Sequence, residues 1–170
     1  AQEAVPGLLD ALACPNPKLQ AAAAQALGRI APGSAQVVDA LVAKLASTDN
    51  PVAESAAKAL GRQGPGAVSA LVATLTSAES AGTGQRAADA LVNAGAMAAP
   101  ALVQLREDQD ATSDTQSLAS AALIKIGRPA LPFLIEGVRR GDVLARQRIL
   151  EIFYGIGPYA FEGFQWARQD

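Results

Sequence analysis

The chain has 170 residues, a formal net charge of −2 and no histidine, and these totals exclude several kinds of site. Without histidine it lacks the usual general base and the commonest metal ligand, so we expect no catalytic residue, no metal and no cofactor. A slightly acidic chain lacks the charge footprint of a nucleic-acid-binding protein, and no apolar run of about 18 or more residues indicates a membrane span.

The first predicted helix pair covers residues 1–33. Its first helix has an apolar stripe at i, i+3, i+4 and i+7 spacing, formed by Val5, Leu8, Leu9 and Leu12. The break at residues 15–17 ends this helix, because proline cannot continue a helix and also restricts the residue before it. We expect a second helix from about Lys18 to Ile30, before a stop at Pro32 and Gly33.

Later units repeat this order of apolar stripe, turn, helix and stop. We expect them at residues 34–66, 67–96, 97–128 and 129–158, with residues 159–170 as the first helix of an incomplete sixth unit. In the unit at 67–96, a loop through Gly82 and Gly84 is expected between the helices. No hinge or low-complexity linker interrupts the series, so the sequence predicts a single domain over residues 1–170.

A marker residue near the end of each second helix gives the repeat length. The markers are Leu27, Leu60, Leu91, Leu123 and Phe153, separated by 33, 31, 32 and 30 residues. A period in this range predicts a solenoid, in which each unit buries its apolar face by stacking on its neighbours. Many of the apolar residues are alanine, the best helix former, and this composition predicts an all-α fold.

The repeating unit reads Val-Pro-x-Leu-Leu, then Asn-Pro, then Ala-Ala-x-Ala-Leu-Gly-Arg-Ile. It resembles the HEAT repeat, specifically the short bacterial form named after phycobilisome lyases. The resemblance covers essentially the whole chain. It implies a right-handed α–α superhelix of about five helix pairs plus a terminal half repeat, with the second helices lining a concave face.

The chain departs from this family at one position. The resemblance implies an arginine seven residues before each marker, which forms a polar ladder between units. Only Arg146 matches, and the other positions hold Gln20, Ala53, Gly84 and Gln116. We therefore expect the first four units to stack mainly through apolar contacts.

Polar residues spaced four apart on the second helices form a stripe, because this spacing places them on one helical face. The candidate partner contacts in this stripe are Arg29, Lys58, Arg62, Asp89, Asn93 and Lys125. If the geometry of the family holds, they face the concave groove. The alternative is a solvated helix face, on which cations near the helix C-termini complement the helix dipole.

All seven aromatic residues lie in the last 38 residues of the chain. Among them, Tyr154, Tyr159, Phe164 and Trp166 are the candidates for an exposed patch. Aromatic side chains dominate the hot spots of protein interfaces. A terminal unit without a following neighbour also needs a thicker apolar cap, so cap and patch both remain open.

The leading functional interpretation is a non-catalytic scaffold that binds a protein or peptide along the concave face. The alternative is a bilin lyase-like subunit that acts on phycobilin chromophore attachment, which follows from the resemblance alone. The sequence predicts no nucleic-acid partner. Its Ala-Gln-Glu start fits both a cleaved signal peptide and a piece of a longer chain, so export and a cytoplasmic location both remain open, as does the oligomeric state.

Overall fold

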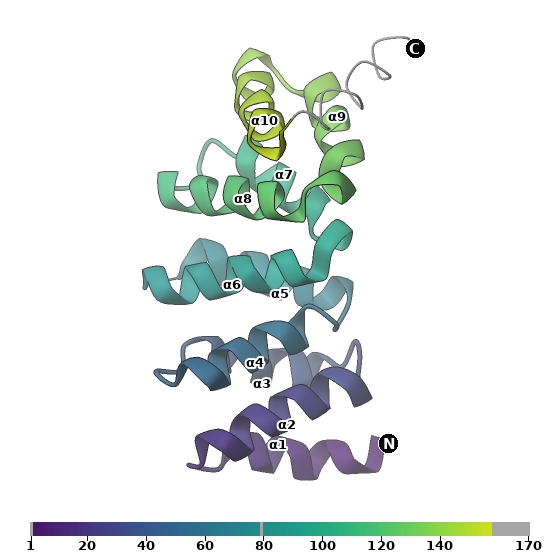
Figure 1. Ribbon diagram of the computed structural model, residues 1–170, viewed down its shortest axis with the longest axis vertical. Helices are drawn as coiled ribbons and strands as arrows, with labels where there is room; N and C mark the ends of the chain where they lie inside the picture. Colours follow the sequence, from purple (N-terminus) through teal and green to yellow (C-terminus); the bar gives the residue numbers. More distant parts are fainter. Residues whose placement is uncertain (1, 79, 158–170) are drawn as a thin grey trace. The chain divides into compact units, whose positions relative to one another are not determined.

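The computed structural model describes residues 2–78 and 80–157, which form ten α-helices in five consecutive pairs (Figure 1). The first three pairs are α1 Val5–Ala13 and α2 Pro17–Ile30, α3 Ala35–Leu45 and α4 Asn50–Leu60, and α5 Pro65–Ser77 and α6 Ala81–Ala94. The last two are α7 Ala99–Glu107 and α8 Ser113–Ile126, and α9 Leu131–Arg140 and α10 Val143–Ile156. The described residues contain no strand, and the all-α prediction is confirmed.

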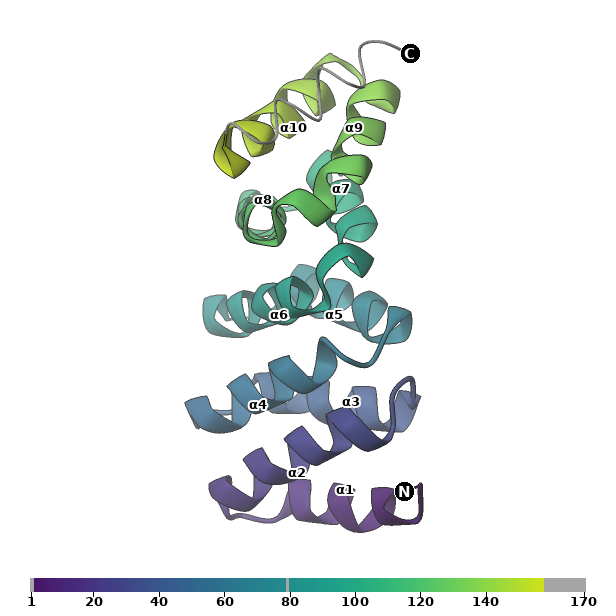
Figure 2. The ribbon, with the colours of Figure 1, turned by 45° about the vertical axis from the view of Figure 1, so that its right-hand side comes forward.

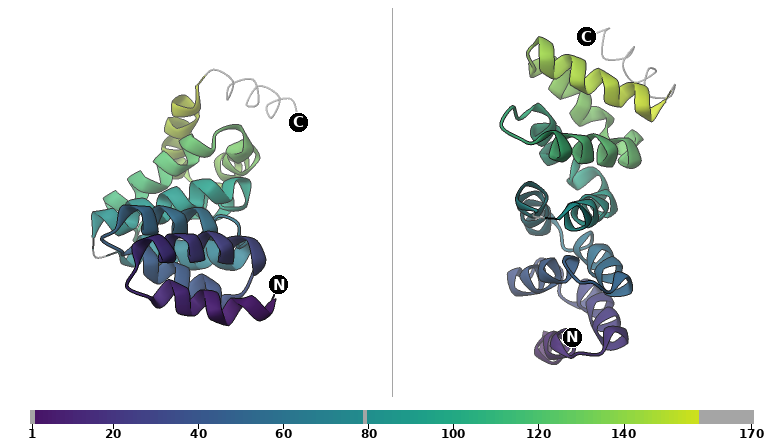
Figure 3. Two further views of the ribbon diagram at one scale, coloured as in Figure 1. Left: turned by 60° about the horizontal axis from the view of Figure 1, so that its bottom comes forward. Right: turned by 90° about the vertical axis from the view of Figure 1, so that its left-hand side faces the viewer.

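The helices form two compact units, Ala1–Ala94 with α1 to α6 and Gly95–Asp170 with α7 to α10. Within the first unit, α1, α3 and α5 make one layer and α2, α4 and α6 make the other (Figure 2). Within the second unit, α7 packs against α8 and α9, and α10 packs against α8 and α9 (Figure 3). Helix pairs that stack on their neighbours along the sequence make an α solenoid, and the chain has this fold. The single domain over 1–170 stays a prediction.

The five predicted markers lie in the core of these helix layers. The side chains of Leu27, Leu60, Leu91, Leu123 and Phe153 are each no more than 2% exposed. The stripes of the first helices are buried as well, at Leu41, Leu71, Leu102 and Leu134. Each buried leucine contributes roughly 1.5–3 kcal/mol to folding, so the repeat period reflects the positions that stabilise the stack.

Local chemistry sets the ends of the second helices. The Asn16 side-chain oxygen accepts a hydrogen bond from the backbone N–H of Lys18, at 3.0 Å, and Asp49 accepts one from Val52, at 3.2 Å. These side chains cap the N-termini of α2 and α4. Helix pairs end at glycines with positive φ, which are Gly33, Gly64, Gly95, Gly127 and Gly157.

The loop expected through Gly82 and Gly84 is wrong, because α6 begins at Ala81 and includes both glycines. The Ser80 hydroxyl oxygen accepts a hydrogen bond from the backbone N–H of Thr83, at 3.2 Å, and this bond satisfies one N–H of the first turn. Gly84 is buried against the rest of the unit. Tertiary packing therefore overrides the low helix propensity of glycine here.

Candidate functional site

The second helices α2 and α4 approach each other closely at their C-terminal ends. A Cβ atom added at Gly28 would lie 2.8 Å from both the Cα and the Cβ of Ala59. The glycine of the Leu-Gly-Arg motif is therefore required for the contact between these two helices. Towards their N-terminal ends the helices leave a groove, whose lining includes the small side chains of Ala21 and Ala22.

Two hollows follow one another along this groove. The larger, of about 820 Å³, lies at the N-terminal ends of α2 and α4 and is lined by Asn16, Pro17, Lys18, Ala21, Ala22, Gln25, Asp49 and Pro51. The smaller, of about 200 Å³, lies at the C-terminal ends and is lined by Gln25, Arg29, Lys58, Ala59 and Arg62. Gln25 belongs to both hollows, and its side-chain N–H donates to the Ser55 hydroxyl at 3.3 Å. The two hollows are therefore neighbours that share the Gln25 side chain.

Three of the predicted contact residues, Arg29, Lys58 and Arg62, come together around the smaller hollow. All three side chains are exposed. Among the residues that the structure describes, none of the three side chains makes a hydrogen bond or an ion pair. The hollow has no carboxylate in its lining, so its electrostatic character is positive.

The other three predicted contacts do not line this groove. Asp89 and Asn93 lie on α6 in the same helix layer, and Asp89 accepts a hydrogen bond from the Gln85 side chain at 3.3 Å. Lys125 is exposed on α8, in the second unit. The structure therefore brings together half of the predicted set, and the role of all six in binding stays a prediction.

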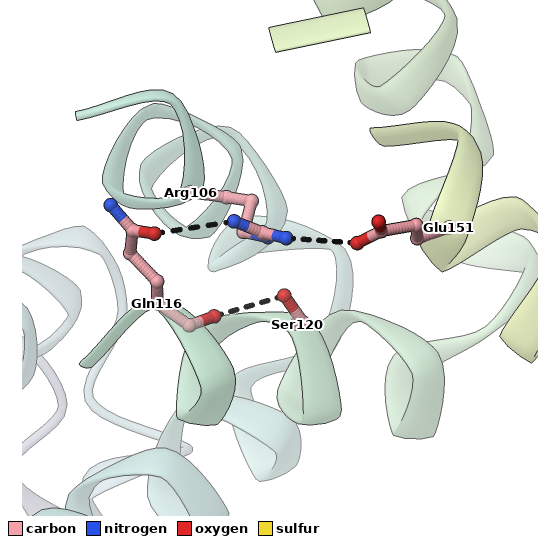
Figure 4. A network of polar contacts seen from close by, with 4 residues as sticks. All are labelled: Arg106, Gln116, Ser120 and Glu151. Carbon is pink, nitrogen blue, oxygen red and sulfur yellow. Dashed lines mark hydrogen bonds and ion pairs between the residues drawn. The ribbon is translucent and has the colours of Figure 1, made fainter. Parts of the chain in front are cut away.

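The second unit has its own polar hollow, of about 440 Å³, whose lining includes Arg106, Gln116, Ser120 and Glu151. Figure 4 shows the polar contacts among these four residues. The Arg106 guanidinium pairs with the Glu151 carboxylate at 3.1 Å and donates to the Gln116 side-chain oxygen at 3.3 Å. The Ser120 hydroxyl donates to the Gln116 backbone carbonyl at 2.9 Å. Because the charge of Arg106 is neutralised by Glu151, this hollow differs from the one around Arg29.

Glu107 is the last residue of α7, and it is half-buried. Burial raises its pKa above the ordinary value of 4.5, and the nearby negative charge of Asp142 raises it further. Its Oε1 atom is buried without a hydrogen-bond partner among the described residues. An isolated buried carboxyl of this kind costs stability when it is ionised.

Of the predicted aromatic patch, only Tyr154 lies within the described residues, and its side chain is 81% exposed. Tyr159, Phe164 and Trp166 lie outside them. Val143, Leu144 and Leu150 on α10 are also exposed. The choice between a cap and a patch therefore stays open.

The described residues contain no group of three or more His, Cys, Asp or Glu side chains placed to hold a metal ion. They also contain no single helix that is long and apolar enough to cross a membrane. Two sharply bent helix pairs reach that length and composition.

The sequence profile of HEAT repeats matches residues 5–92, just over half of the chain. The chain belongs to the HEAT-repeat family. No curated protein is significantly similar to it in sequence.

Several solved structures resemble this HEAT-repeat chain at low identity. The complex of CpcE and CpcF of phycocyanin lyase from Nostoc sp. PCC7120 is 20% identical, with a TM-score of 0.46 over 89% of this chain and 99% of that chain. An engineered protein is 25% identical, with a TM-score of 0.41 over 96% and 86%. A designed armadillo repeat protein in complex with the peptide (KR)4 is 18% identical, with a TM-score of 0.39 over 96% and 87%.

Polar contacts between HEAT units come from residues that the sequence analysis missed. Gln63 is 1% exposed; its side-chain oxygen accepts from the Gly33 N–H at 3.0 Å, and its side-chain N–H donates to the Leu27 carbonyl at 3.4 Å. Its partners lie 30 and 36 residues away in the sequence, close to one repeat. In the sequence, the only local sign of this link between units was a polar residue directly after the Leu-Gly-Arg motif.

Arg86 makes a second contact of this kind. Its guanidinium donates to the Leu45 carbonyl at 2.9 Å and to the Ser47 carbonyl at 2.8 Å, where α3 ends, and to the Asn50 side chain at 2.8 Å. Arg86 lies five residues before the marker Leu91, whereas the family resemblance implies an arginine seven residues before it. The expectation of mainly apolar stacking therefore omitted these links.

The glutamines at the expected arginine positions act within their own helix pair. The side chain of Gln20 donates to the Cys14 carbonyl at 2.5 Å, and that of Gln116 donates to the carbonyls of Asp108 and Ala111 at 2.7 and 3.3 Å. Both hold the turn between the two helices of a pair. Neither residue provides a backbone contact to the next unit.

Proposed function

We propose that this chain is a non-catalytic scaffold that binds a protein or peptide partner along the groove between α2 and α4. The observation that supports the proposal is that two neighbouring hollows, which share Gln25, are lined by residues of both helices. The small side chains of Ala21 and Ala22 in the lining give a ligand backbone room to approach. Amide and charged side chains along the walls supply hydrogen bonds that orient such a ligand.

The length of the groove suits a short extended segment. The helix α2 has 14 residues, so it is about 20 Å long at ~1.5 Å per residue. An extended chain rises ~3.3 Å per residue, so about six residues span this length. The affinity of such a segment would rest on a few desolvated anchors, with the surrounding contacts excluding water.

The proposal extends to the next helix of the same layer. Asp89 and Asn93 on α6 would contact a longer partner that continues past the hollow within the first unit, and Lys125 would provide a separate contact in the second unit. Reversing the charges of Asp89 and Lys125 is then expected to weaken partner binding while the circular dichroism spectrum and the melting temperature stay unchanged. A loss of fold that accompanies the loss of binding would count against this extension.

Selection from a random peptide library on the immobilised chain tests the proposal. We expect enriched peptides whose binding is weakened by Ala22→Gln, which places a larger side chain in the lining of the larger hollow. Ala43→Gln is the matched control, because Ala43 is an exposed alanine on α3, outside the groove. Equal effects of both substitutions, or no enriched peptide, would contradict the proposal.

A further inference from the structure

We infer that the smaller hollow, bounded by Arg29, Lys58 and Arg62, is a pocket for carboxylate groups, and that the partner segment is an acidic peptide. This inference rests on the proposed function and names the chemistry of its partner. Three observations support it. Three cations surround one hollow, none of them caps a helix C-terminus, and α2 and α4 carry more cations than carboxylates.

The three cations converge from two helices on one hollow. Arg29 lies in the last turn of α2, Lys58 lies in the last turn of α4, and Arg62 follows the end of α4. Like charges repel, and these three cations surround a space of about 200 Å³ whose lining contains no carboxylate. They therefore repel one another. A bound anion relieves this repulsion, and arginine offers the planar pair of donors that matches a carboxylate.

Capping of the helix C-termini does not account for these side chains. In this chain a capping arginine has a clear form, because Arg86 donates directly to the Leu45 and Ser47 carbonyls at the end of α3. At the end of α2, the Leu27 carbonyl already accepts from the Ala31 N–H and from the Gln63 side chain. None of the three side chains around the hollow donates to a carbonyl among the described residues. Their donors remain available to a ligand.

The two helices that bound the groove carry more cations than carboxylates. Asp10 is on α1 and Asp39 is on α3, whereas α2 contains no acidic residue. On the α4 side, Asp49 caps the helix and Glu54 is the one acidic residue within it. With Lys18, the stretch formed by α2, α4 and Arg62 holds four cations against these two carboxylates, so the field along the groove is positive although the chain has a net charge of −2.

Among anionic partners, a peptide fits better than a nucleic acid. Single strands bind through aromatic side chains on which the bases stack. Every Phe, Tyr and Trp of the chain lies at residue 133 or later, so α1 to α6 offer no stacking platform. A peptide needs only carboxylate contacts at the smaller hollow and backbone contacts beside Ala21 and Ala22 in the larger one.

Fluorescence anisotropy with fluorescently labelled probes and the full chain tests the inference. The probes are hexaglutamate, hexaserine and an oligothymidylate. We expect hexaglutamate to bind more tightly than the other two, and its binding to weaken as salt rises from ~0.05 to ~0.5 M, because the Debye length shortens. The triple variant Arg29→Gln/Lys58→Gln/Arg62→Gln is expected to lose roughly tenfold to a hundredfold in affinity, at about two- to fivefold per exposed ion pair.

The control variant is Lys44→Gln/Arg128→Gln/Arg140→Gln, which removes the same number of charges from residues that line neither hollow. It is expected to change the affinity for hexaglutamate less than twofold, and circular dichroism checks that both variants fold. Equal losses in the two variants, or tighter binding of the oligothymidylate, would overturn the inference. If hexaserine binds as tightly as hexaglutamate and Ala22→Gln weakens it, the acidic partner is refuted while the proposed scaffold function stands.

Discussion

Gly61 lies where the end of α4 meets α6, and replacing it with alanine tests how closely the helix pairs stack. An added Cβ would lie 2.6 Å from the Asn93 Cβ and 2.9 Å from the Asn93 carbonyl carbon. Both atoms are held by the α6 backbone, so the two helices must separate. Overpacking of this kind costs ~1–3 kcal/mol, while the gain in helix propensity returns up to ~1 kcal/mol, because Gly61 has helical dihedral angles, φ −57° and ψ −16°.

Gly61→Ala is therefore expected to lower the free energy of unfolding by roughly 1–2 kcal/mol, measured by urea denaturation followed by circular dichroism. Gly66→Ala is the matched control in the same unit, because no atom lies within 4 Å of its added Cβ. The control is expected to be neutral or to stabilise the chain by up to ~1 kcal/mol. If Gly61→Ala stabilises the chain as much as Gly66→Ala does, the close packing of α4 on α6 is wrong.

Three other measurements address separate parts of the molecule. Gln63→Ala removes the side-chain partner of the Gly33 N–H and one of the two partners of the Leu27 carbonyl, and it is expected to lower the free energy of unfolding by ~1–3 kcal/mol in urea denaturation. A loss below ~0.5 kcal/mol, as for a surface change, would refute the linking role of Gln63. Because burial raises the pKa of Glu107 above 4.5, the folded chain holds this proton more tightly than the unfolded chain does, and stability falls as pH rises from about 4.5 through the folded pKa. Glu107→Gln should thus raise the melting temperature at neutral pH, with the gain vanishing below pH 4.5; a gain that is independent of pH would contradict this explanation. Addition of a bilin is expected to leave its absorbance spectrum unchanged, and a red shift on binding would favour the lyase-like alternative.

Much of the fold follows from local patterns that the sequence displays directly. The markers from Leu27 to Phe153 are buried as predicted, because repeated stacking requires the same apolar position in every unit. The described residues form five consecutive helix pairs, and α5 begins at Pro65, two residues before the predicted interval 67–96. The loop predicted at Gly82 and Gly84 was wrong, since glycine propensity is a weak local preference and packing against neighbouring helices overrides it.

The candidate site was predictable only in part. The period placed Arg29, Lys58 and Arg62 on the second helices, and the structure adds that they surround one hollow. The hollow itself depends on the contact between Gly28 and Ala59, which lie about one repeat apart. The contacts of Gln63 and Arg86 were not predicted for the same reason. Their partners are backbone carbonyls and an amide 30 to 41 residues away, and a sequence pattern does not show such contacts.

The central claim is that the groove between α2 and α4 holds the partner. The most direct measurement is the mapping of backbone amide chemical shifts by NMR during titration with an enriched peptide. The account predicts that the largest shifts fall within residues 17–30 and 50–62, with the largest of these near Ala22 and Arg29. Shifts concentrated on α1, α3 and α5, the other layer of the unit, would contradict it.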